Sequence, residues 1–378
     1  MSLYIIVGAF LLLCSIVEFT NKKASNQLYY FAFFGLLLML CLRYGQGTDY
    51  FAYQYIYEKM PLTLEFSVLK KMSTYHAEIG WKVLCLLFRY LGLNFYIFTA
   101  VVGTATMFFL NSFIQKYCPL KVTALFIAYP TLFLTYIYSG MRQGLAICAF
   151  LGLFLKWYFE NKKVKFTIGV LICTSIHTSS LVLLLLLFKN LKNIFFKWKH
   201  LIVVVFWIVG LLLYMTGFNI TLFGRTFTNE GTGLSFIAIS ERVLSYVILW
   251  VVYSKYKQKT KEDNDFMDDM MYMYSIGIII YGLLLSMPTT SSRLCYFFKA
   301  LELLIFTVMM KENKKDFPEA STLYFYISAL SMVMLLKNID SYISQGNYYS
   351  YITLWNYPYN NIFVKKDYLY SIHKELIG

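Results

Sequence analysis

The sequence predicts an all-α protein: a polytopic membrane bundle of about ten spanning helices, with a re-entrant hairpin and a short membrane-embedded helix on the extracytoplasmic side. Two observations support this class. The 378-residue chain is 59% hydrophobic, 20% aromatic and only 14% charged, and apolar runs of bilayer-spanning length recur throughout it. Its lysines, moreover, gather in short loops between these runs. We therefore expect one integral membrane domain, residues 1–378.

The expected spanning helices follow the apolar runs in chain order. They cover residues 3–19, 28–42, 95–114, 122–138, 142–159, 201–218, 236–253, 270–287, 293–310 and 321–336. Two further segments do not fit a simple crossing. Residues 79–91 are too few to span a bilayer, and the apolar run at 166–188 is interrupted by the polar stretch CTSIHTSS.

The charge of the loops predicts the topology, because cytoplasmic loops carry an excess of lysine and arginine. Six loops are rich in lysine: NKKASNQ, QKYCPLK, ENKKVK, KNLKNIFFKWKH, KYKQKTK and KENKK. All six can be cytoplasmic only if 79–91 and 166–188 do not cross. We therefore expect 166–188 to be a re-entrant hairpin whose limbs meet near His177, buried in protein or facing a watery cavity. A single crossing that breaks the charge rule is the alternative.

This topology places both termini outside, together with two long extracytoplasmic segments, 43–78 and 337–378. It also accounts for the net charge of +14, so we expect a lipid bilayer and no nucleic acid as partner. The seven cysteines include no C-x-x-C pair and the four histidines are scattered. We therefore expect no metal site and no cofactor.

Three arginines stand on the extracytoplasmic side, where the charge rule gives them no reason to be. Arg43 follows one expected helix, whereas Arg142 and Arg293 each open a helix after a candidate serine cap, Ser139 or Ser292. Helix amides, the helix dipole and guanidinium groups would then converge on one space, which suits a phosphate or pyrophosphate. The alternative is that these arginines are interfacial anchors reaching toward headgroups.

Candidate proton acceptors stand on the same side. Asp49 follows two glycines in a turn, Glu78 precedes the short apolar segment, and His177 lies among hydroxyl residues. Each could act as a general base. Structural roles are the alternatives: a turn cap for Asp49, a helix-start acid for Glu78 and a satisfied polar group for His177.

Candidate sugar contacts lie beside these groups. The tyrosine-rich stretch that includes Tyr50 and Tyr53 could stack on sugar rings, although an aromatic belt at the membrane surface would have the same composition. Gln143 follows the second arginine, and Arg225 stands in the extracytoplasmic loop 219–235.

Two sets of charged residues within the expected helices call for partners. We expect Glu241 and Arg242 to form a structural pair. Glu302, in the middle of an expected helix, needs a partner, for which Lys299 is the nearest candidate.

Six short motifs along the chain carry a family resemblance. They are R-Y-G-Q-G-T-D-Y at 43–50, E-I-G at 78–80, S-G-M-R-Q-G-L-A at 139–146, I-H-T-S at 176–179, S-R-L-C-Y-F at 292–297 and Y-P-Y-N at 357–360. In this order and almost end to end, the chain resembles the EpsG/Wzy-type family of bacterial polysaccharide repeat-unit polymerases.

The resemblance implies a membrane glycosyltransferase that joins oligosaccharide units carried on undecaprenyl pyrophosphate at the outer face of the bacterial cytoplasmic membrane. Its product would be of the exopolysaccharide, capsule or O-antigen type. By position, Arg142 and Arg293 would neutralise the leaving pyrophosphate, with Arg43 as a third cation. One of the three candidate bases would take the acceptor proton, without a metal. A flippase and a chain-length regulator are the partners implied.

Two other functions remain open at this stage. A transporter or flippase for lipid-linked oligosaccharides would show internal repeats and broken helices, and no clear repeat is present. A ligase that moves finished glycan from the same carrier to another acceptor would use a similar arginine site.

Overall fold

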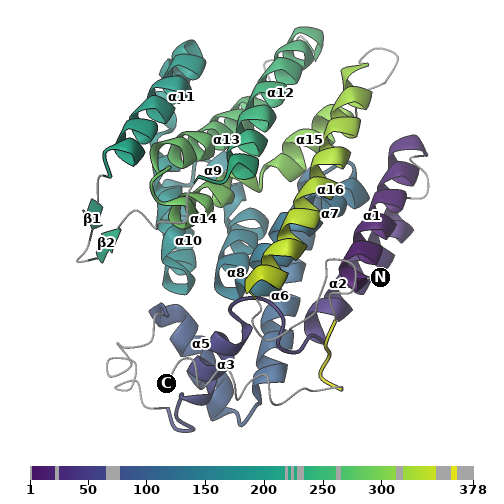
Figure 1. Cartoon of the computed structure of the whole chain (residues 1–378), viewed down its shortest axis with the longest axis vertical. Helices are drawn as coiled ribbons and strands as arrows, with labels where there is room; N and C mark the ends of the chain where they lie inside the picture. Colours follow the sequence, from purple (N-terminus) through teal and green to yellow (C-terminus); the bar gives the residue numbers. More distant parts are fainter. Residues whose placement is uncertain are drawn as a thin grey trace.

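The computed structural model describes residues 2–21, 25–64, 77–217, 220–222, 225–227, 234–260, 265–311, 318–345 and 359–363. These residues form a helical bundle with one two-stranded hairpin, β1 (Ile220–Leu222) and β2 (Arg225–Phe227). Figure 1 shows the long helices side by side, with α3 and α5 gathered at one end.

The helices follow one another closely along the chain. They are α1 (Leu3–Thr20), α2 (Ser25–Cys41), α3 (Tyr50–Glu58), α5 (Ile79–Tyr90), α6 (Phe95–Tyr117), α7 (Lys121–Ala128), the π-helix η3 (Tyr129–Ser139), α8 (Met141–Ala149), the π-helix η4 (Phe150–Phe154), α9 (Leu155–Phe159), α10 (Lys163–Ile176), the 3₁₀-helix η5 (Thr178–Leu191), α11 (Lys192–Met215), α12 (Phe236–Thr260), α13 (Asp265–Leu283), α14 (Pro288–Lys299), α15 (Glu302–Met310) and α16 (Glu319–Gln345).

The polytopic helical bundle is confirmed, although the spans are less regular than hydropathy predicts. Among the described residues, six helical stretches are long and apolar enough to cross a membrane: Leu3–Thr20, Phe95–Tyr117, Lys121–Ser139, Thr178–Met215, Phe236–Lys259 and Glu319–Ser341. Other expected spans change along their length: residues 141–159 pass from α8 through the π-helix η4 into α9, and residues 293–310 are interrupted between α14 and α15. Hydropathy averages over such breaks and cannot locate them.

Several expected helix limits are wrong, and two of these differences affect the site. α14 begins at Pro288 rather than Arg293, because proline is preorganised for the first helical turn. α16 continues past the expected limit at residue 336 to Gln345, so the first nine residues of the expected tail, 337–345, are helical. Of the remaining tail, residues 346–358 and 364–378 lie outside the described part of the chain.

The segment around His177 folds back on itself as predicted. α10 and η5 pack against each other, and the chain reverses at His177, whose backbone is extended (φ −150°, ψ 116°). Lys163 and Lys189, near the far ends of the two limbs, line a common cleft. This reversal favours the hairpin over a single crossing. The expected short helix is also present as α5, which has 12 residues.

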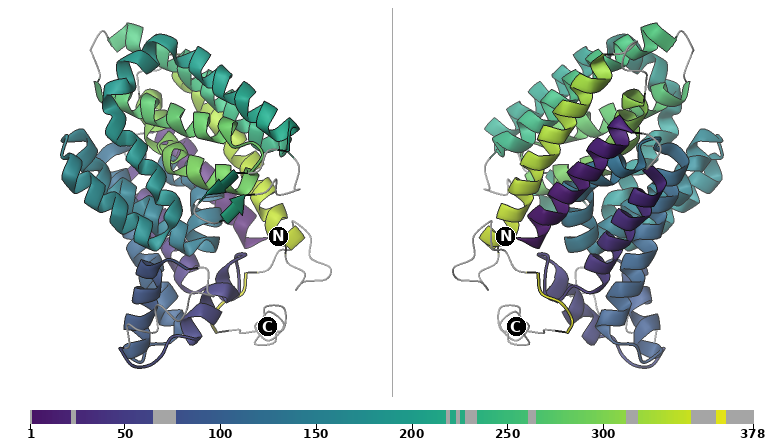
Figure 2. Two further views of the ribbon diagram at one scale, coloured as in Figure 1. Left: turned by 90° about the vertical axis from the view of Figure 1, so that its left-hand side faces the viewer. Right: turned by 90° about the vertical axis from the view of Figure 1, so that its right-hand side faces the viewer.

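Lysine side chains cluster at the end of the bundle away from the His177 turn. Asp269 at the start of α13 pairs with Lys189 at 2.8 Å and with Lys192 at 2.6 Å. At the same end of the bundle, Lys255 near the end of α12 pairs with Glu319, the first residue of α16, at 2.7 Å. Figure 2 shows the opposite end, where α3 and α5 lie.

An aromatic cluster fixes α3 and α5 against the start of α6. Tyr50, Tyr57, Trp81, Phe95 and Phe98 are all at most 4% exposed, and their rings meet mostly edge to face or tilted. Such ring pairs stabilise beyond their buried area. The tyrosine-rich stretch is thus largely the core of this end of the molecule.

A buried carboxylate joins the first helix to the middle of the chain. Glu18, near the end of α1, accepts hydrogen bonds from the backbone amides of Val122 at 3.0 Å and Thr123 at 2.7 Å. It also accepts a hydrogen bond from the Thr123 hydroxyl at 2.8 Å. These amides open α7 and have no partner within the helix, so Glu18 caps α7 from another helix.

Replacing Glu18 with alanine should lower the free energy of unfolding by about 2 kcal/mol, because buried amides lose charge-assisted hydrogen bonds. Thermal unfolding of the purified protein in detergent would measure the change. E160A is the matched control, since Glu160 forms an exposed ion pair with Lys162 and such pairs contribute little. Equal thermal unfolding temperatures for E18A and E160A would contradict the capping role of Glu18.

Candidate functional site

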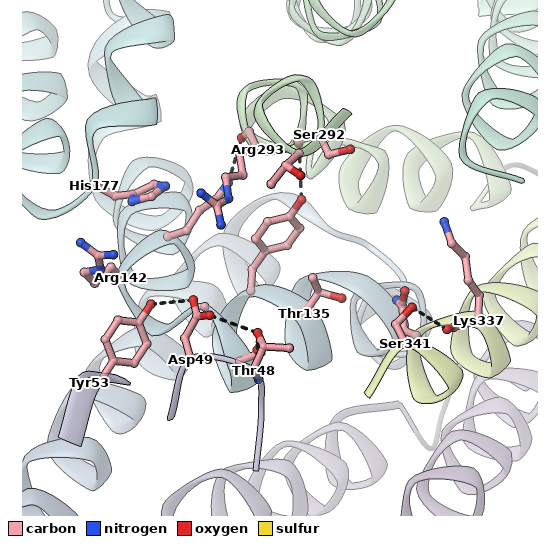
Figure 3. Close-up of a pocket in the computed structure, with 16 residues that line it drawn as sticks. Thr48, Asp49, Tyr53, Thr135, Arg142, His177, Ser292, Arg293, Lys337 and Ser341 are labelled. Atoms are coloured by element: carbon pink, nitrogen blue, oxygen red, sulfur yellow. Dashed lines mark hydrogen bonds between the residues drawn. The ribbon is translucent and has the colours of Figure 1, made fainter. Parts of the chain in front are cut away.

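A polar cavity of about 460 Å³ lies at the end of the bundle that carries the His177 turn (Figure 3). Segments distant in the sequence meet around it: the loop before α3, η3, α8, the hairpin turn, α14 and α16. Six of the predicted site residues line it: Asp49, Tyr53, Arg142, Gln143, His177 and Arg293.

The glycine-rich loop before α3 brings Asp49 to this cavity. Gly47 has φ +94°, and a Cβ atom there would lie 2.8 Å from the Cα atom of Ser139, so only glycine fits. The next residue, Thr48, donates its amide to Ser139 Oγ at 2.8 Å. Ser139 therefore holds this loop. The sequence suggested that Ser139 caps α8, but no side chain caps that helix.

A π-helix forms another part of the wall. η3 ends at Ser139, and Thr135 and Tyr136 from its last turns line the cavity. α8 approaches η3 closely, because a Cβ atom on Gly144 would lie 2.5 Å from the Tyr136 carbonyl oxygen. π-Helical turns are rare and occur frequently at functional sites.

Glu78 connects three elements at the cavity. One carboxylate oxygen pairs with Arg142 Nη1 at 2.5 Å. The other carboxylate oxygen accepts hydrogen bonds from the Thr178 amide and the Thr178 hydroxyl, each at 3.0 Å. The same oxygen lies 3.5 Å from His177 Nδ1. Burial alone would raise the pKa of Glu78, but the nearby His177 imidazole, the Arg142 charge and the Thr178 amide outweigh it and lower the pKa to about 2. Glu78 is thus a permanent anion at neutral pH.

The other two candidate bases, Asp49 and His177, line the cavity itself. Asp49 accepts hydrogen bonds from the Thr48 hydroxyl at 3.1 Å and the Tyr53 hydroxyl at 3.2 Å. Burial and the Asp49 charge raise the pKa of Tyr53, so its hydroxyl stays a donor. His177 Nε2 has no hydrogen-bond partner within the described part of the chain. His177 is thus the candidate whose acceptor nitrogen is not already occupied by a hydrogen bond within the described residues, whereas Asp49 and Glu78 both accept such bonds.

Arg293 differs from its predicted setting. It lies in the second turn of α14, so the amides at the helix start belong to the residues just after Pro288. Gln143 holds this turn in place by donating to the Arg293 carbonyl at 2.8 Å. Among the described residues, no carboxylate forms an ion pair with the Arg293 guanidinium, which leaves its charge available to a ligand.

A buried ion cluster supports α14 behind Arg293. As predicted, Glu241 pairs with Arg242, at 3.2 Å, and Lys299 pairs with Glu302, at 2.5 Å. Lys299 also reaches Glu241 at 2.5 Å. Arg242 donates to the Ser292 hydroxyl at 3.4 Å, so Ser292 contacts this cluster and does not cap a helix.

Four predicted site residues do not line the cavity: Glu78, which stands behind Arg142 and His177, and Arg43, Tyr50 and Arg225. Arg43 is 2% exposed, donates to the Tyr138 carbonyl and lies over the Tyr138 ring at 4.5 Å. It also pairs through its backbone with Asn361 from the tail. Tyr50 is completely buried in the aromatic cluster. Arg225 falls in β2, and its side chain lies outside the described residues.

Sequence reasoning missed the contribution of α16. Lys337, Asn338 and Ser341 line the cavity, but they were assigned to a tail beyond the last helix. A cation directly after the last expected helix, at its outer end, was the available signal. The described residues contain no group of three histidine, cysteine, aspartate or glutamate side chains that could hold a metal ion.

Acid should weaken the Glu78 junction. Because its pKa falls from the ordinary 4.5 to about 2 on folding, Glu78 contributes stability that is present above pH 4.5 and is lost as pH falls toward 2. The contribution should be on the order of 2 kcal/mol, allowing for partial exposure. Thermal unfolding followed from pH 7 to pH 3 should show less pH dependence in E78Q than in wild type or E160Q. Identical acid profiles would contradict the ion pair.

Comparison with known families gives one match: the EpsG family model matches residues 26–353. This range covers most of the chain and includes every cavity residue named above. Comparisons with curated proteins and with solved structures find no match. The family expected from the motifs is thus the family found, and the chain belongs to the EpsG family.

Proposed function

We propose that the protein polymerises oligosaccharide repeat units carried on undecaprenyl pyrophosphate, at the outer face of the bacterial cytoplasmic membrane. Membership of the EpsG family implies a function of the polysaccharide polymerase type. The observation that supports the finer assignment is that Arg142 and Arg293, from two distant helices, line one cavity together with His177. The product is of the exopolysaccharide, capsule or O-antigen type.

The distribution of charge supports an outward-facing cavity. The paired lysines of α11, α12 and η5 lie at the other end of the bundle, and lysine-rich ends are normally cytoplasmic. The substrate then has to reach the outer leaflet before it can react. A flippase that delivers the lipid-linked unit is therefore a required partner, and a chain-length regulator would act on the product.

The reaction transfers a glycosyl group. An acceptor sugar hydroxyl forms a bond with the anomeric carbon of the donor, and the bond from that carbon to the pyrophosphate oxygen breaks. The electron pair of the broken bond goes to the leaving pyrophosphate. Arg142 and Arg293 stabilise this charge, an effect of about 3–4 kcal/mol per well-placed donor. Guanidinium groups suit the task because they bind phosphate oxygens through paired hydrogen bonds.

His177 takes the proton released by the acceptor hydroxyl. Its Nε2 atom is buried and has no hydrogen-bond partner within the described residues, and Nδ1 lies 3.5 Å from the Glu78 carboxylate. A carboxylate beside Nδ1 orients an imidazole and stabilises its protonated form. Glu78 is accordingly a positioning residue, since its low pKa, about 2, makes it a poor base. Asp49 orients the Tyr53 hydroxyl at the cavity wall.

R142A and R293A should each reduce polymer formation by about 100-fold or more, because each removes one donor to the leaving group. Unit-length lipid-linked oligosaccharide should accumulate, as measured by gel analysis of extracted lipids and polymer. The arginine-to-lysine variants should recover little activity, since lysine cannot make paired hydrogen bonds.

R89A is the matched control for these variants. Arg89 lies in α5 near the same end of the bundle but does not line the cavity. Polymer of normal amount and length in R142A and R293A, with the protein inserted at wild-type level, would remove the pyrophosphate assignment.

H177N should lower kcat by about 10²-fold or more while KM changes little, because a general base acts mainly in the transition state. The assay uses purified protein and lipid-linked units. H200N is the control, since His200 contacts Tyr246 away from the cavity. Activity of H177N within twofold of wild type would transfer the base role to Asp49.

A further inference from the structure

The α16 side of the cavity contains a cation that the proposed reaction does not use. Lys337 and Ser341 are one helical turn apart and both line the cavity. Asn338, between them, donates to the Pro130 carbonyl and lies 3.5 Å from Thr131 Oγ1. These contacts with η3 fix the rotation of α16 and keep Lys337 turned toward the cavity.

Lys337 has no ion-pair partner in the described part of the protein; the charges that act on it are those of Arg242 and Glu241, which are opposite in sign. No carboxylate there forms an ion pair with it, and Asp340, three residues on, is exposed. Arg142 by contrast is matched by Glu78 at 2.5 Å. A lysine in an apolar helix is costly without a counter-charge. Interfacial lysines avoid this cost by reaching the headgroups, but Lys337 lines the cavity.

Lys337 is separated from the predicted pyrophosphate ligands. In Figure 3, Arg142 and His177 lie on one side of Thr135, and Lys337 and Ser341 lie on the other. Neutral hydroxyl residues line the cavity as well, including Thr135, Thr289 and Ser292. Such groups suit the hydroxyls of sugars that extend away from a pyrophosphate.

We infer that Lys337 forms a second anion subsite, which binds a carboxylate on an acidic sugar of the repeat unit. This inference rests on the proposed function. A single ammonium group can balance the one charge of a carboxylate, and it stands apart from the two arginines that supply paired donors for the pyrophosphate. The repeat unit therefore contains a uronic acid or another carboxylated sugar, and Lys337 selects for it.

The test compares native and carboxyl-reduced substrate. Lipid-linked units are extracted from cells that carry the R142A variant, and their sugars are analysed for carboxylates. Half of the sample is then treated with carbodiimide and borohydride to convert carboxylates to alcohols. Purified wild type, K337M and the control K165M are assayed with both samples. Lys165 is an exposed residue of α10, remote from the cavity.

We expect wild type and K165M to lose about tenfold or more in kcat/KM on the reduced units, the effect of one charge-assisted hydrogen bond. K337M should be equally slow with both samples. Inhibition by undecaprenyl pyrophosphate should stay within twofold of wild type in K337M, because the arginines bind that group. Repeat units without a carboxylate, or an unchanged preference in K337M, would overturn the subsite. So would weaker undecaprenyl pyrophosphate inhibition in K337M, which would assign Lys337 to the pyrophosphate.

A binding measurement separates this inference from the proposed function. Repeat oligosaccharide released from its carrier, native or carboxyl-reduced, is titrated into wild type and K337M, and thermal unfolding is recorded. Stabilisation of wild type by the native oligosaccharide alone, absent in K337M, supports the subsite even if no polymer forms from native units. Failure of wild type to polymerise native units would reject the proposed function only.

Discussion

The cavity depends on one carboxylate, Glu78, which is bound by groups from two other elements. Its partners are Arg142 at the start of α8 and Thr178 at the hairpin turn, with the His177 ring nearby. A partly buried anion is stable only when it is paired and hydrogen-bonded. Glu78 therefore fixes the position of the hairpin turn relative to α8, and so sets where the imidazole and guanidinium groups stand.

A second set of buried charges acts on the other side of the cavity. Glu241, Arg242, Lys299 and Glu302 connect α12, α14 and α15 through short ion pairs. Because Arg242 reaches Ser292, this cluster holds the turn of α14 that carries Arg293. The two arginines that face the cavity are thus positioned by separate networks. The π-helix η3 lies between them and supplies neutral wall residues.

The helical class, the hairpin at His177 and the gathering of Arg142, Arg293, His177 and Asp49 could be predicted from apolar length and loop charge. Both signals are local in sequence and respond directly to the membrane. The cap of α7 by Glu18 could not be predicted, because it joins residues about one hundred positions apart. Arg43 was misjudged for a related reason: its burial beside Tyr138 depends on tertiary packing. Lys337 was missed because hydropathy falls at polar residues even where a helix continues.

Everything in this mechanism requires that one pyrophosphate is held by guanidinium groups from α8 and α14. An experimental structure with undecaprenyl pyrophosphate bound measures this most directly. We predict the diphosphate in the cavity, within hydrogen-bond distance of both Arg142 and Arg293. A diphosphate bound at the lysine-rich end, or in contact with neither arginine, would contradict the mechanism.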